Sequence, residues 1–393
     1  MGKQNNIPEL RFPEFESFWQ KKKLKELCTL ITKGTTPNRF VESGVRFIKI
    51  ECLLDDKIID ERCLFVDDLT HKKELRRSIL NEGDILFAIA GATIGKCSIV
   101  TKEILPANTN QALSLIRLEE NENKLFVYYC LKSNKMQKYI IDTISVGAQP
   151  NLNLEQMGNF SFSIPSLSEQ TKIATFLTSI DDRLNQLKKK KTLLEQYKKG
   201  VMQKIFAQEI RFQDGDGEEF PEWEIKTINE IFYIKAGGDV DKSNVSSVKT
   251  EKYKFPIYSN SDKEKGLFGF TDTYRINEEC ITVTGRGTLG IAIARYQAFY
   301  PIVRLLVLTP KLPINVKFYE NAINRINFAV ESTGVPQLTS PQISNYSVEY
   351  PCLKEQTKIA NFLSAIDDKI SQCSVQINKT EQWKKGLLQQ MFV

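Results

Sequence analysis

Apolar residues recur at alternating steps of four and three positions in two separate stretches of the chain. In the first stretch these positions are Ile173, Leu177, Ile180, Leu184 and Leu187. In the second stretch they are Ile359, Leu363, Ile366, Ile370, Cys373 and Ile377, and the pattern continues through Leu387 and Met391. This spacing is a heptad seam, which is typical of an α-helix that packs along a partner helix. We therefore expect two helices of about 40 residues, each roughly 60 Å long.

The two stretches are copies of one another. Residues 165–206 and 351–392 align without a gap, and 21 of the 42 positions are identical. A repeat at this distance indicates two tandem domains and not a solenoid. Because one helix cannot bury its seam alone, we expect the two copies to pack on each other in antiparallel orientation. Ser168 is the expected N-cap of the first copy, and its counterpart Lys354 cannot cap in this way.

Outside these helices the pattern is mostly that of short strands bounded by Gly, Asn and Pro. The expected strands are residues 45–50, 84–90, 113–118, 280–284, 291–294 and 302–308. Further helices are expected at residues 124–139 and 316–329. The predicted fold class is α+β, with two strand-rich globular domains joined by two long antiparallel coiled-coil helices and related by a pseudo-twofold.

Shorter repeated segments occur at matching positions in the two globular parts. Glu-Leu-Arg-Phe at residues 9–12, followed by Trp19, corresponds to Glu-Ile-Arg-Phe at residues 209–212, followed by Trp223. The turns at 91–95 and 286–290 also match in position, as do those at 147–152 and 334–338. Between these markers the two domains differ in sequence. Two recognition modules for two different targets would share such markers and differ in the sequence between them.

The positive charge of the chain is concentrated in the predicted helices. The formal net charge is +6, with 54 basic and 48 acidic side chains. Residues 168–208 carry nine basic and four acidic side chains, and residues 354–393 carry six and four. The globular parts are therefore close to neutral. If they bind a nucleic acid, they do so through local patches and not through a general positive field.

Cysteine and histidine usage argues against a zinc or redox site. The eight cysteines are never closer than 11 residues, and the single histidine, His71, lies in a charged stretch where we expect it to be solvated. Free, reduced thiols are therefore expected. No apolar run reaches the roughly 18–20 residues of a membrane span, and the first 12 residues lack the apolar core of a signal peptide. These features favour a cytoplasmic protein.

Familiar catalytic motifs are missing or incomplete. The run from Gly91 to Lys96 is one residue too short for a phosphate-binding loop, and Cys97 stands where Ser or Thr would bind magnesium. Asp216, Glu224 and Lys226 match a nuclease-like Asp…Glu-x-Lys pattern that arises often by chance. We find no dinucleotide fingerprint and no Asn-Pro-Pro-aromatic run of adenine methyltransferases. The sequence thus predicts no catalytic residue and no metal site in this chain.

The repeated segment carries a resemblance to a known family. Two strand-rich domains, each followed by Pro-x-Leu-x-Glu-Gln-x-Lys-Ile-Ala-x-Phe-Leu-x-x-Ile-Asp-Asp, resemble the specificity (S) subunit of type I restriction–modification systems. The run at residues 83–96 is similar to the family's recognition domains, whereas the second copy departs from it at residues 279–283. The resemblance implies target recognition domains at residues 1–165 and 209–352, and conserved spacer helices at residues 166–208 and 353–393.

The resemblance also implies a function. Each target recognition domain would read one half of a split, asymmetric sequence in double-stranded DNA. The helices would set the spacing of the halves and dock two modification subunits that methylate adenine, and restriction subunits would join to translocate and cleave DNA. The chain itself would not be catalytic. S-adenosylmethionine, ATP and Mg²⁺ would bind in the partner subunits, and this chain would hold no cofactor.

Candidate DNA-contacting residues are polar side chains in turn-rich stretches, because Arg, Lys, Asn and Gln discriminate base edges. The candidates of the first domain are Lys33, Thr35, Thr36, Asn38, Arg39, Lys96, Asn110 and Gln111. Those of the second domain are Lys235, Lys242, Asn244, Arg275, Arg286, Gln297 and Gln337. For any single one of these residues, the ordinary interpretation is a solvated loop residue.

Two other functions remain open at this point. A coiled-coil scaffold without DNA function would also need long helices, although two divergent domains of equal frame argue against it. An enzyme with restriction or methyltransferase activity of its own would need a cofactor loop and acidic metal ligands that the sequence does not show.

Overall fold

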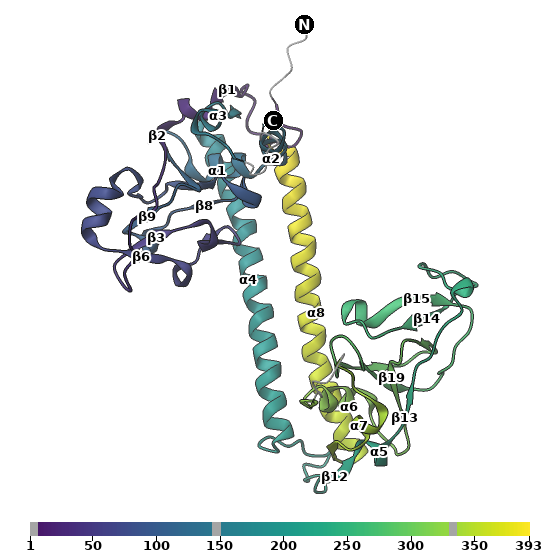
Figure 1. Ribbon diagram of the computed structural model, residues 1–393. Coiled ribbons are helices and arrows are strands. Elements are labelled where there is room, and N and C mark those ends of the chain that lie inside the picture. Colours follow the sequence, from purple (N-terminus) through teal and green to yellow (C-terminus); the bar gives the residue numbers. More distant parts are fainter. Residues whose placement is uncertain (1–6, 144–150, 330–335) are drawn as a thin grey trace. The chain divides into compact units, whose positions relative to one another are not determined.

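The computed structural model describes residues 7–143, 151–329 and 336–393, which form two compact units (Figure 1). Unit 1 comprises Met1–Lys189 and Ser374–Val393, and unit 2 comprises Lys190–Cys373. The long helix α4 (Leu167–Phe206) begins in unit 1 and ends in unit 2. The long helix α8 (Leu353–Gln390) begins in unit 2 and ends in unit 1. Each unit is therefore completed by the far end of the helix that starts in the other.

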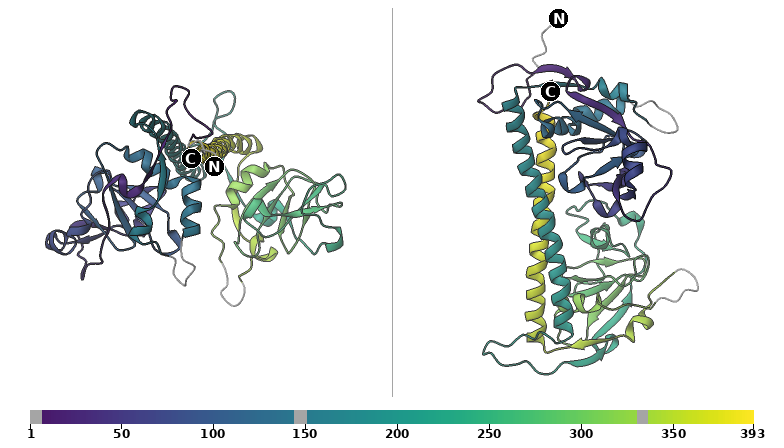
Figure 2. Two further views of the ribbon diagram at one scale, coloured as in Figure 1. Left: turned by 90° about the horizontal axis from the view of Figure 1, so that it is seen from above. Right: turned by 90° about the vertical axis from the view of Figure 1, so that its left-hand side faces the viewer.

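The two helices lie side by side in opposite directions within each unit, as the sequence predicted (Figures 1 and 2). In unit 1 the ammonium of Lys384 pairs with the carboxylate of Asp181. In unit 2 Lys198 Nζ lies 2.6 Å from Asp367 Oδ1. Both pairs join the Ile-Asp-Asp of one copy to the Lys-Lys-Gly of the other, so the duplicated motifs are complementary when antiparallel.

The apolar seam contacts more than the partner helix. Ile173, Leu177 and Ile180 are buried in the core of unit 1 together with Trp19 and with Phe392 from the end of α8. In the core of unit 2, Ile359, Leu363 and Ile366 likewise pack with Trp223 and Phe206. Of the remaining predicted seam residues, Leu187 and Ile370 are half-buried, and the buried ones are Leu184, Cys373, Ile377, Leu387 and Met391. The first turns of each seam thus belong to a globular core.

Both units contain the same arrangement of strands. The four-stranded sheet of unit 1 has the order β2-β10-β7-β8, and that of unit 2 has the order β13-β19-β16-β17. Each unit adds a three-stranded sheet, β6-β3-β9 or β15-β14-β18, in which one neighbour of the central strand is antiparallel and the other parallel. A two-stranded pair, β1-β11 or β12-β20, brings the chain to the start of a long helix. The common arrangement inferred from the sequence is thereby confirmed for the described strands, whereas the matching turns at 147–152 and 334–338 lie partly outside the described residues.

The strands have the following bounds. Those of unit 1 are β1 (Gln20–Lys23), β2 (Cys28–Lys33), β3 (Val45–Ile48), β4 (Leu53–Leu54), β5 (Lys57–Ile58), β6 (Leu64–Val66), β7 (Ile85–Ala88), β8 (Cys97–Ile99), β9 (Ala107–Thr109), β10 (Leu113–Leu118) and β11 (Ser161–Ile164). Those of unit 2 are β12 (Glu224–Thr227), β13 (Phe232–Ala236), β14 (Phe255–Tyr258), β15 (Leu267–Thr271), β16 (Cys280–Val283), β17 (Ala292–Arg295), β18 (Tyr300–Pro301), β19 (Leu306–Pro310) and β20 (Ser347–Tyr350).

The short helices are α1 (Lys124–Lys132), α2 (Asn134–Thr143), α3 (Leu154–Gly158), α5 (Ile228–Ile231), α6 (Val316–Ile323) and α7 (Ser340–Ser344). The helix predicted at 124–139 is interrupted, because Ser133 has extended backbone and ends α1. The helix predicted at 316–329 stops at Ile323, where Asn324 follows as the C-cap. The strand predicted at 302–308 is wrong in its first half, because a turn occupies residues 302–305 and β19 begins at Leu306.

The duplicated Glu-Gln pair at the start of each long helix binds its globular domain. Glu169 is fully buried and accepts hydrogen bonds from Arg11 Nε (2.7 Å), Arg11 Nη2 (2.8 Å) and Trp19 Nε1 (3.2 Å). Glu355 is bound in the same way by Arg211 (3.0 Å) and Trp223 (2.8 Å). We call these two groups the carboxylate clamps. They explain why the Arg and Trp echoes recur together with the helix motif.

The glutamine that follows each clamp carboxylate closes a second connection. Gln170 accepts a hydrogen bond from the backbone N–H of Asn123 (3.1 Å), and Gln356 accepts one from Asn315 (2.8 Å). Asn123 and Asn315 cap α1 and α6, so each long helix is tied to the first turn of a short helix in its own unit. Hydrogen bonds made by buried side chains such as Gln170 and Gln356 fix orientation as well as adding stability.

Two local predictions are wrong. The helix cap of α4 is Ser166 and not Ser168, because the N–H of Glu169 donates to Ser166 Oγ (3.4 Å). His71 is buried and not solvated: it lies in a π-helical turn (Thr70–Glu74), and its Nδ1 donates to Asn108 Oδ1 (2.5 Å). The observed cap lies two residues before the predicted one. The burial of His71 depends on Asn108, which is 37 residues away in the sequence. No helix within the described residues is long and apolar enough to cross a membrane.

Candidate nucleic-acid interface

In unit 1, several predicted DNA-contacting residues meet at one edge of the four-stranded sheet. The register places the end of β2 beside the start of β10, with Lys33 opposite Ser114. Beyond these strands the N–H of Gly34 donates to Asn110 O (3.2 Å), and Thr36 Oγ1 donates to Gln111 Oε1 (2.7 Å). The two connections that follow β2 and precede β10 are thus bound to each other.

A glycine is required where these connections touch. A Cβ on Gly34 would lie 1.7 Å from Thr109 O, which no side chain permits. The close approach brings Lys33, Thr35, Thr36, Asn110 and Gln111 into one polar surface, and all of them except Asn110 are exposed. Asn110 is half-buried, and its Oδ1 accepts from the N–H of Ala112 (3.1 Å).

The other predicted residues of the first domain have local partners or stand alone. Arg39, whose side chain is 72% exposed, pairs with Asp67 at 3.0 Å. A hydrogen bond from the N–H of Thr70 holds the pKa of Asp67 below its usual range, so this carboxylate remains charged. Lys96 Nζ donates to Leu53 O (3.4 Å), and Asn38 is exposed. Arg39 and Lys96 are therefore tethered, although both remain accessible.

In unit 2 the corresponding edge joins three connections. Arg286 Nη2 donates to Gln337 Oε1 (3.5 Å), so the structure brings these two predicted residues together. Asn260, which sequence reasoning missed, accepts from the N–H of Gly285 (2.7 Å) through Oδ1 and donates to Val303 O through Nδ2. One side chain thus links residues 259–266, 284–290 and 302–305. The signal available in the sequence was the polar run Ser-Asn-Ser-Asp directly after a strand.

Most other candidates of the second domain are engaged within the unit. The guanidinium of Arg275 lies 4.6 Å from the ring centre of Tyr300, and Asn244 donates to Asp272. Gln297 Nε2 donates to Tyr258 Oη (3.2 Å). Lys235 and Lys242 are exposed. Among the described residues, no hydrogen bond or ion pair joins these side chains to Arg286 or Gln337.

A buried arginine shapes the loop beside Asn260. Arg295 is only 5% exposed, and burial lowers the pKa of its guanidinium. It stacks on Tyr258 at 3.5 Å and donates to Thr282 Oγ1 (3.0 Å) and Lys265 O (2.7 Å). Glu264 and Lys265 adopt left-handed backbone, which is costly for residues other than glycine. Arg295 thus contributes to holding this exposed loop in an unusual shape.

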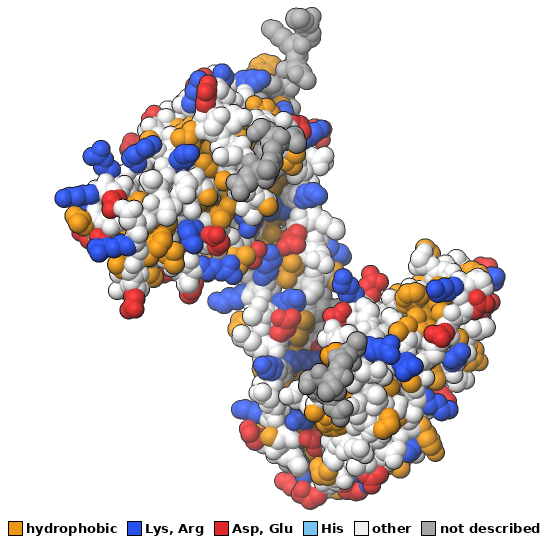
Figure 3. All heavy atoms as spheres, viewed as in Figure 1, with side chains coloured by type: hydrophobic (Ala, Val, Ile, Leu, Met, Phe, Trp, Pro, Cys, Tyr) orange, Lys and Arg blue, Asp and Glu red, His pale blue; other side chains and the backbone are white. Residues whose placement is uncertain are grey.

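Basic and acidic side chains are interspersed over the visible face of each unit (Figure 3). This agrees with the near-neutral charge that the sequence gives the globular parts. Affinity for a polyanion must then come from particular side chains, because a general positive field is not present on that face.

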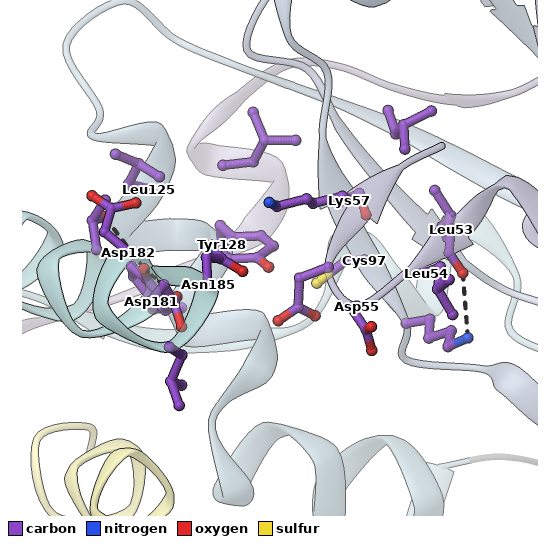
Figure 4. A pocket seen from close by; sticks show the side chains of 18 of the residues that line it. Leu53, Leu54, Asp55, Lys57, Cys97, Leu125, Tyr128, Asp181, Asp182 and Asn185 are labelled. Atoms are coloured by element: carbon purple, nitrogen blue, oxygen red, sulfur yellow. Dashed lines mark hydrogen bonds between the residues drawn. The ribbon is translucent and has the colours of Figure 1, made fainter. Parts of the chain in front are cut away.

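Unit 1 also contains a cavity of about 750 Å³ beside the β4–β5 hairpin, α1 and the two long helices (Figure 4). Asp181, on its wall, accepts a hydrogen bond from Tyr129 Oη (2.8 Å) and pairs with Lys384. Lys188 pairs with Glu381 at 2.8 Å. Burial raises the pKa of Tyr129, so its phenol stays protonated. The protonated phenol and these two ion pairs suit packing better than proton transfer.

Within the described ranges, no group of three or more His, Cys, Asp or Glu side chains is placed to hold a metal ion. In the Asp216, Glu224 and Lys226 pattern, Lys226 Nζ pairs with Glu224 Oε2 at 2.5 Å, and the backbone N–H of Asp216 donates to Asp214 Oδ1 at 2.9 Å.

Comparison with known proteins gives one consistent result. The model of the family described as "Type I restriction modification DNA specificity domain" matches residues 16–196 and 221–380. A Mycoplasma pneumoniae protein described as a type I specificity subunit is 31% identical over 260 residues, which are 66% of this chain and 69% of that protein. The specificity subunit described for the Methanocaldococcus jannaschii restriction enzyme MjaX is 25% identical over 408 residues, covering 98% and 95% of the two chains.

A solved structure has the same fold. The S subunit of a type I restriction–modification system from M. genitalium matches with a TM-score of 0.66 and 17% identity. The match covers 98% of this chain and 99% of that one. At this identity the likeness concerns the arrangement of helices and strands alone.

Proposed function

Because the chain belongs to the family of type I restriction–modification DNA specificity subunits, we propose that it selects the DNA sequence on which a modifying complex acts. In this proposal the strand-rich domain of unit 1 reads one half of a split target, and that of unit 2 reads the other half. The observation that carries the proposal is the separate match of the family model to residues 16–196 and to residues 221–380. The equal strand order of the two units supports it.

The two half-sites should differ in sequence. The sheets of the two units share their order, but the connections at the sheet edge do not share their side chains. Asn110 and Gln111 occupy one connection in unit 1, and Ile302–Leu305 occupies the equivalent one in unit 2. Because base discrimination depends on the side chains that reach base edges, equal frames with unequal connections favour an asymmetric target.

The two long helices would act as spacer and as docking surface for two modification subunits. Tyr197 and Trp383 stand at the same position of the repeat, and they are 53% and 49% exposed. Aromatic residues are enriched in protein interfaces. A half-exposed aromatic side chain at the same position of both repeats therefore suits the binding of two copies of one partner subunit.

Methyl transfer to adenine would be performed by the modification subunits, and restriction subunits would add translocation and cleavage. S-adenosylmethionine, ATP and Mg²⁺ would accordingly bind outside this chain, and the assembly would work on DNA in the cytoplasm. The scaffold without DNA function is not supported, because the family match covers both globular domains. Methyl transfer by the purified chain alone would contradict the proposed division of labour.

Mapping of methylated adenine in genomic DNA tests the proposal. Cells that carry the chain together with its modification subunits should show N6-methyladenine in a two-part motif, and cells that lack the chain should lose that motif alone. A second arm replaces residues 209–352 with the matching part of a related specificity subunit, which should change one half of the motif and preserve the other. Identical methylation maps with and without the chain would overturn the proposal.

A further inference from the structure

The connection between β18 and β19 in unit 2 has a counterpart among the predicted DNA-contacting residues of unit 1. β9 and β18 both pair in parallel with the central strand of a three-stranded sheet, and β10 and β19 both follow as central strands of the larger sheet. The β9–β10 connection contains Asn110 and Gln111. The β18–β19 connection contains Val303 and Arg304 instead. Both residues fall within the strand that the sequence pattern predicted at 302–308.

Val303 and Arg304 are held in a strained turn. Their φ angles are 51° and 58°, in the left-handed region that costs ordinary residues about 1–2 kcal/mol each and is rarest for β-branched side chains. The N–H groups of Val303 and Arg304 donate to Gly238 O and Gly237 O, both at 3.0 Å. Asn260 Nδ2 donates to Val303 O from the other side. Surrounding contacts therefore impose the conformation, and strain of this kind gathers at functional sites.

The turn exposes a side chain that nothing in the described structure uses. Unit 2 has six arginines, and five of them have a partner: Arg211 binds Glu355, Arg275 stacks on Tyr300, Arg286 binds Gln337, Arg295 binds Lys265 O and Arg325 binds Glu349. Arg304 is exposed, and its guanidinium makes no hydrogen bond, ion pair or ring contact with any described residue. Val303 beside it is 46% exposed although it is apolar.

We propose that Arg304 is a specificity-determining residue of the half-site read by unit 2, and that Asn260 positions the turn that presents it. This inference rests on the proposed function. A free guanidinium offers paired donors that match guanine O6 and N7 in the major groove. Arg304 therefore contacts a guanine, and the rigid turn reduces the conformational entropy that the contact costs.

The test measures methylation rates of the assembled complex on a DNA library. The library contains every base at each position of the motif. Arg304→Ala should reduce discrimination at one guanine in one half of the motif by roughly 5- to 150-fold, the range for one bidentate contact. The other half should be unaffected. Arg304→Lys keeps the charge without the fork and should recover only part of the discrimination. The control Lys354→Ala removes an exposed cation of the same unit at the start of α8 and should change neither half.

Asn260→Ala tests the positioning role by its pattern across the motif. It should weaken discrimination at the same guanine as Arg304→Ala, and the double variant should lose little more than either single variant, because the two residues act as one unit. Equal losses in both half-sites would show a general folding defect and would refute the role of Asn260.

The possible failures are distinguishable. If the unaltered complex methylates a two-part motif and Arg304→Ala leaves the discrimination unchanged, the role of Arg304 is refuted and the proposed function stands. If the variant binds all sequences more weakly and its affinity depends less on salt, Arg304 contacts phosphate and the base contact is refuted. If the unaltered complex methylates no two-part motif, the proposed function and this inference both fail.

Discussion

Replacing Glu169 by Gln should increase local unfolding at the start of α4 in unit 1 and leave unit 2 unchanged. The carboxylate is fully buried, and it accepts two bonds from Arg11, whose side chain is 11% exposed, and one from Trp19. Breaking a buried pair costs about 3–5 kcal/mol, because the remaining charge loses its compensation. The amide oxygen can still accept one bond, so we expect the lower end, about 3 kcal/mol. That corresponds to a local opening constant increased more than about 100-fold.

Hydrogen exchange followed by mass spectrometry measures this opening peptide by peptide in the full chain. Peptides from residues 167–189 should exchange faster in Glu169→Gln, while peptides from residues 353–373 in unit 2 should keep their protection. Glu355→Gln should give the opposite pattern. The control is Glu195→Gln: this carboxylate has a 49% exposed side chain and an i,i+4 lysine at 3.5 Å, so its loss should cost about 0.5 kcal/mol or less. Equal exchange in Glu169→Gln and Glu195→Gln would refute the clamp argument.

Three smaller predictions concern other parts of the chain. Lys198→Met should destabilise unit 2 by about 1 kcal/mol or less in urea unfolding, because its pair with Asp367 is partly exposed; a loss of several kcal/mol would be inconsistent with this. Burial raises the pKa values of Cys97 and Cys280 to about 12, so both thiols stay protonated from pH 7 to pH 9 and iodoacetamide should leave them unmodified in the folded protein; labelling as fast as in urea would contradict this. Val303→Gly should raise the stability of unit 2 by about 1 kcal/mol, because glycine adopts φ near 51° without strain; lower stability in the same urea assay would disprove the strain.

The long helices could be predicted from the sequence because their signal is local and repeated. The expected ranges 166–208 and 353–393 agree closely with Leu167–Phe206 and Leu353–Gln390. A seam that continues from Ile359 through Met391 leaves few alternatives to a paired helix. The direction of pairing also followed from the duplication, and the Lys384–Asp181 pair confirms it in unit 1.

The functional details could not be predicted, because they depend on contacts distant in sequence. The Arg and Trp echoes were visible, but their binding of Glu169 spans 158 and 150 residues. Residues 302–308 are rich in apolar and β-branched side chains, so their pattern indicates a strand. Instead, hydrogen bonds to Asn260 and to the backbone of Gly237 and Gly238 impose a turn at residues 302–305. Because Arg304 was predicted to lie in a strand, it was not among the candidate DNA-contacting residues.

The exchange of helix ends between the units has a consequence for synthesis on the ribosome. The core of unit 1 contains Leu387, Leu388, Met391 and Phe392, which are translated more than 200 residues after most of that unit has emerged. Unit 1 is thus begun before unit 2 and completed after it, whereas unit 2 is a single continuous segment that can close as soon as Cys373 has left the exit tunnel. A premature stop at any codon from Ser374 to Val393 would consequently damage unit 1 and leave the continuous segment of unit 2 intact.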